Sequence, residues 1–110
     1  MKVVVTAQGT TLDDFVDPRF GRCRYFLFVD SETLMLESAN NEFAAAAGGA
    51  GIQSAQFVVE RGAEAVITGS LGPNAAGVLK QAGIPAYRGA GTIASVVEKL
   101  RDGKLPVAER

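Results

Sequence analysis

Most of the chemistry that this sequence offers lies in ten residues near its start. Three of the eleven Lys and Arg residues and the only cysteine fall in the run Asp17-Pro18-Arg19-Phe20-Gly21-Arg22-Cys23-Arg24-Tyr25-Phe26. Basic side chains attract anions, and they favour the thiolate form of a neighbouring cysteine, which is the form that binds metals. The run therefore indicates a site for an anion or a metal–sulfur group, with Cys23 as the candidate metal ligand.

The same side chains also have interpretations that need no ligand. A lone cysteine is commonly a small buried hydrophobe. Arg19 and Arg22 could be surface charges that pair with Asp13, Asp14 or Asp17. The sequence leaves both interpretations open, because the choice depends on where the fold places this loop.

The composition excludes several classes of protein. The chain has 110 residues, 47% of them hydrophobic, which suits one domain with one core. We expect that domain to span residues 1–103 and to leave a frayed polar tail at 104–110. A net charge of −1 argues against nucleic-acid binding. No apolar run has the length of a membrane span or the pattern of a signal peptide, so we expect a cytoplasmic protein.

The sequence also lacks the residues that most catalytic sites need. It has no histidine, which removes the commonest general base and every histidine metal site. One cysteine permits neither an internal disulfide nor a four-thiolate cluster site within one chain. Ser70 and Thr92 have no base beside them, and the first strand lacks the carboxylate that a two-metal nuclease on a similar sheet would need. We therefore expect a protein that is not an enzyme.

Hydrophobic periodicity and turn residues predict eight elements. Runs of β-branched and aromatic residues predict strands at 3–7, 25–30, 34–39, 65–68 and 84–87. Helices are predicted from about 49–51 to 61, from 73 to 81, and from an N-cap at Thr92 to 100. Three strands followed by alternating helices and strands predict an α/β domain, with a mixed five-stranded sheet and helices on its faces.

Strand direction predicts that four loops meet at one edge of this sheet. They are the loop at 8–23 and three glycine-rich segments that open helices, Gly48–Gly51, Gly69–Asn74 and Gly89–Thr92. Helix N-termini favour anions, and ligands of open α/β sheets bind at this edge. Glycine at such junctions is also ordinary turn chemistry, so the convergence of the loops, and no single loop, indicates a ligand. The candidate contacts are Arg19, Gly21, Arg22, Cys23, Gly49, Gly51, Ser70, Gly72, Asn74, Gly91 and Thr92.

Four segments, taken together, form a pattern specific enough to compare with known families. They are the run at 17–26, Gly49-Ala50-Gly51-Ile52-Gln53, Gly69-Ser70-Leu71-Gly72-Pro73-Asn74-Ala75 and Gly83-Ile84-Pro85. This pattern resembles the dinitrogenase iron–molybdenum cofactor biosynthesis family, of the NifX/NifY type that also forms the C-terminal domain of NifB. The resemblance covers essentially the whole chain and implies a ribonuclease-H-like three-layer fold.

The resemblance also implies a function. Nitrogen-fixation members bind and carry iron–sulfur or iron–molybdenum cluster precursors. We therefore expect a carrier that binds such a cluster transiently and meets cluster-assembly proteins, as a monomer or weak homodimer. The cluster would rest on the glycine-loop amides, with Arg19, Arg22 and Arg24 balancing its charge. Many relatives have alanine at the position of Cys23, so the resemblance makes a thiolate ligand there optional.

Two alternatives stay open at this point. One is a module that binds a small organic anion or a nucleotide at the same edge of the sheet. The other is a regulatory protein that acts through a protein partner, with this edge as its interface.

Overall fold

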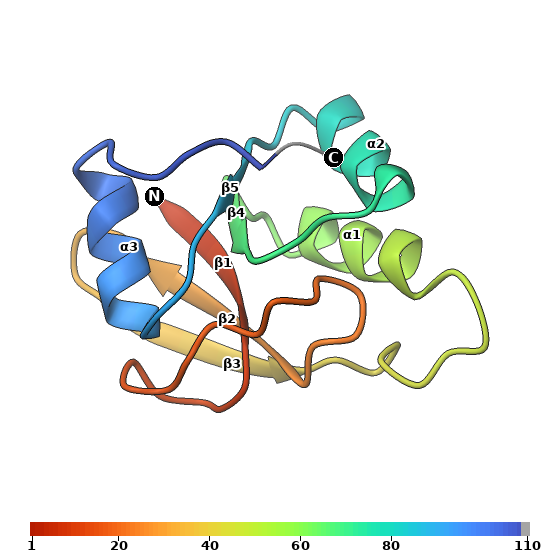
Figure 1. Cartoon of the computed structure of the whole chain (residues 1–110), viewed down its shortest axis with the longest axis horizontal. Helices are drawn as coiled ribbons and strands as arrows, with labels where there is room; N and C mark the ends of the chain where they lie inside the picture. The colour runs from red at the N-terminus through yellow and green to blue at the C-terminus, as the bar shows by residue number, and fades with distance from the viewer. Residues whose placement is uncertain (109–110) are drawn as a thin grey trace.

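The computed structural model describes residues 1–108 and contains the eight predicted elements in the predicted order (Figure 1). The strands are β1 (Lys2–Ala7), β2 (Tyr25–Asp30), β3 (Leu36–Asn40), β4 (Ala65–Thr68) and β5 (Ala86–Arg88). The helices are α1 (Ala50–Glu60), α2 (Pro73–Gln81) and α3 (Ile93–Arg101). None of the helices described combines the length and the apolarity that crossing a membrane requires.

Two strands begin later than the sequence predicts, each for a backbone reason. Leu34 has a φ of 63°, a left-handed conformation that a strand does not contain, so β3 begins only at Leu36. Pro85 has no N–H to donate to a sheet, so β5 begins at Ala86. The carbonyl of Pro85 still accepts from the Val66 N–H at 3.0 Å.

The strands form one mixed sheet in the order β3-β2-β1-β4-β5. β2 runs antiparallel to both β1 and β3, whereas β4 runs parallel to β1 and β5 parallel to β4. The antiparallel neighbours are joined by loops. The parallel pair β4 and β5 is joined through α2, and the chain between β1 and β4 passes through β2, β3 and α1. The predicted mixed five-stranded sheet is confirmed.

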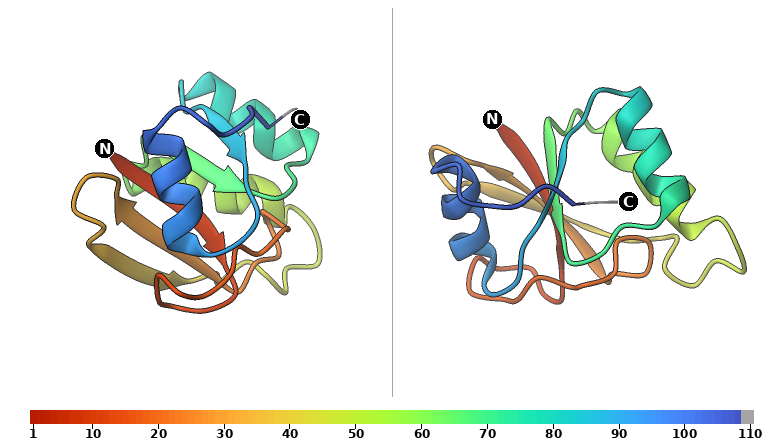
Figure 2. Two further views of the ribbon diagram at one scale, coloured as in Figure 1. Left: turned by 60° about the vertical axis from the view of Figure 1, so that its left-hand side comes forward. Right: turned by 45° about the horizontal axis from the view of Figure 1, so that its top comes forward.

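The helices cover both faces of the sheet, which gives three layers (Figure 2). Side chains alternate along β1, so Val4 belongs to the core beneath α1 and α2, while Val3 and Val5 belong to the core beneath α3. Both cores are largely aliphatic, and the core beneath α1 and α2 also contains Phe20 and Phe26, whose ring centroids lie 6.0 Å apart. β1 and β4 are therefore buried on both faces of the sheet, as their continuous apolar runs predict.

The segment after α3 differs from the frayed tail that the sequence predicts. It runs beside β5, where the Arg88 N–H donates to the Pro106 carbonyl at 2.8 Å and the Ala108 N–H to the Ala86 carbonyl at 2.9 Å. β5 is an edge strand, and the segment supplies partners for its outer backbone groups. The prediction of fraying is wrong for 104–108, and the rest of the predicted tail, 109–110, lies outside the described residues.

The long loop between β1 and β2 is tied to the sheet by backbone hydrogen bonds. The Asp17 N–H donates to the Thr6 carbonyl at 2.8 Å, and the Pro18 carbonyl accepts from the Ser70 N–H at 2.7 Å. The backbone at Gly69 lies so close to Pro18 that this position needs glycine. A β-carbon on Gly69 would lie 2.5 Å from the Pro18 Cα. The loop is thus anchored beside the start of the β4–α2 connection.

We expect substitution of Gly69 by alanine to destabilise the fold. Its β-carbon would meet the backbone of Pro18, which has to move, and overpacking of this kind costs about 1–3 kcal/mol. The free energy of unfolding, measured by urea denaturation, should fall by that amount for Gly69→Ala.

Gly77→Ala is the matched control for this prediction. Gly77 lies in the exposed middle of α2, and a β-carbon there would meet no atom within 4 Å. Alanine in a helix interior should raise stability by about 0.5–1 kcal/mol. Equal effects of the two substitutions would contradict the importance of the close approach at Pro18.

Candidate functional site

Three of the four predicted loops line one hollow of about 390 Å³ at the edge of the sheet. The loop between β1 and β2 (8–24), which we call the basic loop, contributes 19–22. The start of α1 contributes 49–52, and the β4–α2 connection contributes Ser70 and 72–75. The only ionisable side chains among these lining residues are Arg19 and Arg22. The hollow therefore presents positive charge and no carboxylate, which favours an anion.

The starts of α1 and α2 both face this hollow without a side-chain cap. Their N-cap residues are Gly49 and Gly72, and neither helix has a capping hydrogen bond from a side chain. The first amides that bond back to these caps are those of Gln53, to the Gly49 carbonyl at 2.9 Å, and Ala76, to the Gly72 carbonyl at 3.0 Å. The amides before them are the unpaired donors of a helix start, except that Pro73, the first residue of α2, has no N–H to donate.

Helix α3 provides the contrast. Its N-cap residue Thr92 accepts the Ser95 N–H on Oγ1 at 3.3 Å, so a side chain occupies this helix start. Gly91 uses its carbonyl to accept from the Val16 N–H at 2.9 Å. Neither residue lines the hollow, because α3 lies on the opposite face of the sheet from α1 and α2 (Figure 2). The fourth loop does meet the long β1–β2 loop, through a bridge between Phe15 and Thr92, but Gly91 and Thr92 are not among the residues that line the hollow.

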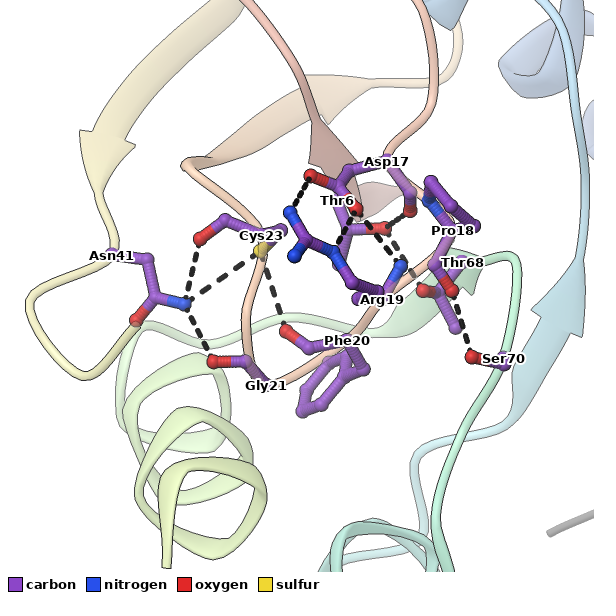
Figure 3. A network of polar contacts seen from close by, with 10 residues as sticks. All are labelled: Thr6, Asp17, Pro18, Arg19, Phe20, Gly21, Cys23, Asn41, Thr68 and Ser70. Atoms are coloured by element: carbon purple, nitrogen blue, oxygen red, sulfur yellow. Dashed lines mark hydrogen bonds and ion pairs between the residues drawn. The ribbon is translucent and has the colours of Figure 1, made fainter. Parts of the chain in front are cut away.

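Arg19 has an ion-pair partner in the buried carboxylate of Asp17 (Figure 3). Its Nε and Nη2 donate to the two oxygens of Asp17, each at 3.3 Å, and this hydrogen bonding raises the pKa of Arg19. The Arg19 side chain is nevertheless 63% exposed, against 5% for Asp17. The ion pair with an aspartate that the interpretation without a ligand predicts for Arg19 is thus present. It orients the Arg19 guanidinium, which remains exposed to solvent.

Arg22 is held by backbone carbonyls and not by an aspartate. Its Nη1 donates to the carbonyls of Ala44 and Ala46, both at 2.7 Å. Both acceptors belong to the segment that leads into α1, so this guanidinium joins the basic loop to the helix start. Since carbonyls carry no net charge, the full positive charge of Arg22 remains at the hollow.

Three polar side chains hold the basic loop in place, and the sequence interpretation selected only Ser70 among them (Figure 3). The Thr6 hydroxyl lies 2.7 Å from the Asp17 carbonyl and 2.9 Å from the Thr68 hydroxyl, and both threonines are fully buried. Ser70 Oγ donates to the Pro18 carbonyl at 2.8 Å. Threonines inside otherwise apolar strands are the sequence signal that could have identified this network.

Asn41 is a second positioning residue that the sequence interpretation missed. Its Nδ2 donates to the carbonyls of Gly21 at 3.0 Å and Cys23 at 2.9 Å, and its Oδ1 accepts from the Phe43 N–H at 3.0 Å. Gly21 also packs closely on α1, where a β-carbon would lie 2.8 Å from the Gly51 nitrogen. These contacts bring the middle of the basic loop to the start of α1.

Cys23 lies in the core and does not line the hollow. Its side chain is fully buried, and Sγ donates to the Phe20 carbonyl at 3.3 Å. Burial raises the pKa of the thiol from its ordinary 9.0 to about 12, with a smaller contribution from the charge of Asp17. The prediction that Arg22 and Arg24 favour the thiolate is wrong, because burial of the thiol raises its pKa while both arginines lie at the surface.

The structure thus separates the predicted contacts into two groups. The hollow is lined by Arg19, Gly21, Arg22, Gly49, Gly51, Ser70, Gly72 and Asn74. Cys23, Gly91 and Thr92 lie elsewhere. Within residues 1–108, His, Cys, Asp and Glu side chains form no group of three or more that could hold a metal ion. The lining residues can therefore offer hydrogen-bond donors and positive charge, but not a set of metal ligands.

Comparison with known proteins gives a consistent set of relatives. The family described as dinitrogenase iron-molybdenum cofactor matches residues 1–103. An uncharacterized protein of Methanocaldococcus jannaschii is 33% identical over 109 residues, which cover 96% of this chain and 89% of the relative. The apo form of the orange protein from Desulfovibrio gigas has a TM-score of 0.91 and 38% identity, covering 97% of this chain and 92% of that one. A Thermotoga protein described as a candidate NifB protein of the DUF35 family has a TM-score of 0.82 and 33% identity, covering 96% and 91%.

The burial of Cys23 predicts that its thiol is unreactive in the native protein. Reaction with iodoacetamide at pH 8.5 should be at least about 100-fold slower in buffer than in urea, because alkylation needs both exposure and the thiolate. The rate can be followed by mass spectrometry. A Ser38→Cys, Cys23→Ala double variant, which places the thiol on an exposed position of β3, should label rapidly in buffer and serves as the control.

The raised pKa also predicts a pH dependence of stability. Below about pH 9 the thiol is protonated in both the folded and the unfolded chain, so it adds no pH dependence. Between about pH 9 and 12 only the unfolded chain loses the proton, so stability falls as the pH rises. The loss of unfolding free energy over this range should be smaller for Cys23→Ala than for the wild type. Parallel curves would contradict the burial of a protonated thiol.

Proposed function

Since the chain belongs to the dinitrogenase iron-molybdenum cofactor family, we propose that it binds and carries a metal–sulfur cluster precursor in the hollow between its basic loop and the starts of α1 and α2. The cluster is cargo, bound as an intact anion and released to a cluster-assembly protein. In this proposal the chain acts as a carrier and not as an enzyme.

The single observation that carries the proposal is the convergence of two uncapped helix starts on a hollow without carboxylates. Unpaired amides at helix N-termini bind anions through hydrogen bonds and through the positive end of the helix dipole. Arg22 adds a positive charge that no carboxylate offsets, and Arg19 adds a guanidinium that is paired with Asp17. Hydrogen bonds in which one partner is charged are about twice as strong as neutral ones. Sulfide or oxide atoms on the outside of a cluster are acceptors suited to such donors.

The kind of donors supports transient binding of a preformed cluster. No cysteine, histidine, aspartate or glutamate is among the residues that line the hollow, so the metal would keep its own ligands. A cluster held by amides and guanidinium groups can leave without breaking a bond between protein and metal. We accordingly assign Cys23 to the core and not to the ligand set.

The chemistry of the hollow also supports a role without catalysis. The ionisable side chains that line it are both arginines, which stay protonated at all physiological pH values. Proton transfer near neutral pH needs a group that titrates there. The sheet order β3-β2-β1-β4-β5 with β2 antiparallel supports the ribonuclease-H-like classification, and β1 (Lys2–Ala7) contains no carboxylate for a nuclease metal.

Asn74→Asp tests the proposal without harming the fold. Asn74 lies in the first turn of α2 and lines the hollow, and an aspartate there should stabilise the helix by about 0.3–1 kcal/mol. The same charge should repel an anionic cluster and weaken its binding by about tenfold. The measurement is anaerobic reconstitution with iron, sulfide and molybdate, followed by desalting, absorption spectra and metal analysis.

The controls separate the roles of charge and of the thiol. Asn74→Ala changes the same side chain without adding charge and should bind the cluster nearly as well as the wild type. Cys23→Ala should also retain it. A wild type that holds no stoichiometric cluster, or an Asn74→Asp variant that holds as much as the wild type, would refute the proposal. Loss of the cluster in Cys23→Ala would instead support a thiolate ligand.

A further inference from the structure

A second hollow lies on the other side of Arg19. It has a volume of about 390 Å³ and is lined by Gln8, Asp17, Pro18, Arg19 and Arg24. Arg19 lines both hollows, and it is the one residue that they share. Arg19 therefore lies between two adjoining hollows.

Arg24 supplies a second positive charge to this hollow. It is exposed, and its Cζ lies 5.4 Å from the centroid of the Tyr25 ring. Stacking on an aromatic ring orients a guanidinium while its N–H groups remain available at the edge. Within residues 1–108, the side chain of Arg24 has neither an ion-pair partner nor a hydrogen-bond acceptor. A charged group that is oriented but unpaired is available to a ligand.

The negative charge in this hollow is already compensated. Asp17 is 4% exposed, and its oxygens accept from the Arg19 backbone N–H at 2.9 Å as well as from the Arg19 side chain. Two arginines against one aspartate leave a net charge of +1 on the lining side chains. The Arg19 nitrogen Nη1 makes no contact with Asp17, and the exposed amide of Gln8 adds a neutral donor. This hollow therefore also offers donors to an anion.

Hydrogen bonds join Pro18, which lines the second hollow, to Ser70, which lines the first. The Pro18 carbonyl accepts from both the N–H and the hydroxyl of Ser70, at 2.7 and 2.8 Å. Gly69 lets these backbones meet, since a β-carbon there would lie 2.5 Å from the Pro18 Cα. The two hollows are consequently held in a fixed relation, as two subsites of one ligand would be.

We propose that Gln8, Arg19 and Arg24 form a second anion subsite, so that a cluster with negative groups at both ends would span Arg19 and reach both hollows. This inference rests on the proposed function, because the first hollow is the cluster site proposed above. It adds a length requirement: a compact anion fills one subsite, whereas an elongated one reaches Arg24.

Inorganic phosphates of different length test this requirement without any cluster. Orthophosphate and tripolyphosphate are titrated by calorimetry at low ionic strength into the wild type and Arg24→Gln. In Arg24→Gln, the loss of a charged hydrogen bond should weaken the binding of tripolyphosphate by about tenfold. Orthophosphate is too short to span Arg19 and should bind mainly in the first hollow, which also has the two helix starts, so its affinity should change by less than about twofold.

Arg61→Gln is the matched control. Arg61 is also exposed and also lies over aromatic rings, with its Cζ 5.0 Å from the centroid of Phe28, but it follows the C-terminal end of α1. The substitution removes the same charge far from the α1 start, so it should leave the ratio of the two affinities unchanged.

Three outcomes would overturn the second subsite. They are a wild type that does not bind tripolyphosphate more tightly than orthophosphate, an Arg24→Gln variant that weakens both equally, and an Arg61→Gln variant with the same selective loss. Each is measured without the cluster reconstitution of Asn74→Asp, so failure of the second subsite is distinguishable from failure of the carrier function.

Discussion

The candidate site depends on two places where backbone lies against backbone with no room for a side chain. At one, Gly69 meets Pro18, and at the other, Gly21 meets the start of α1 at Gly51. Together they press the basic loop onto the starts of α1 and α2, and the hydrogen bonds of Ser70 and Asn41 hold it there. A side chain at either contact would move the loop away from these helix starts. The shape of the hollow thus follows from steric constraints, and its charge follows from the residues placed around it.

The electrostatics of the site follow from how each charged group is used. Asp17, which lies two residues before Arg19, is buried and its charge is offset by Arg19. Arg22 donates hydrogen bonds to two neutral carbonyls, so no carboxylate offsets its positive charge at the hollow. The two helix starts that face the hollow are uncapped, whereas Thr92 caps the one that does not. Donors without partners are therefore concentrated on one side of the sheet.

The sequence predicted the architecture well because the elements are locally encoded. The order of the strands and helices could be predicted from the apolar runs at β1, β2 and β4 and from the glycines that end the helices. The direction of the strands then predicted the edge of the sheet at which the loops meet. The errors arose where non-local contacts decide. A polar tail was expected to fray, but β5 is an edge strand and its backbone groups pair with that segment. Gly91 and Thr92 were expected at the site, but the face on which a crossover helix packs is a property of the whole sheet.

The sequence by itself determined the chemical types available: clustered arginines, one thiol, glycine-rich helix starts, and no histidine for acid–base or metal chemistry. The tertiary structure alone decided which of them act together. Cys23 and Arg22 are neighbours in the chain, yet the thiol points into the core, where burial keeps it protonated, while the guanidinium reaches the surface. Residues adjacent in sequence can lie in environments of opposite polarity, because a packed core admits the small apolar group and excludes the charge. Arg19 to Arg22 therefore belong to the site, and Cys23 belongs to the core.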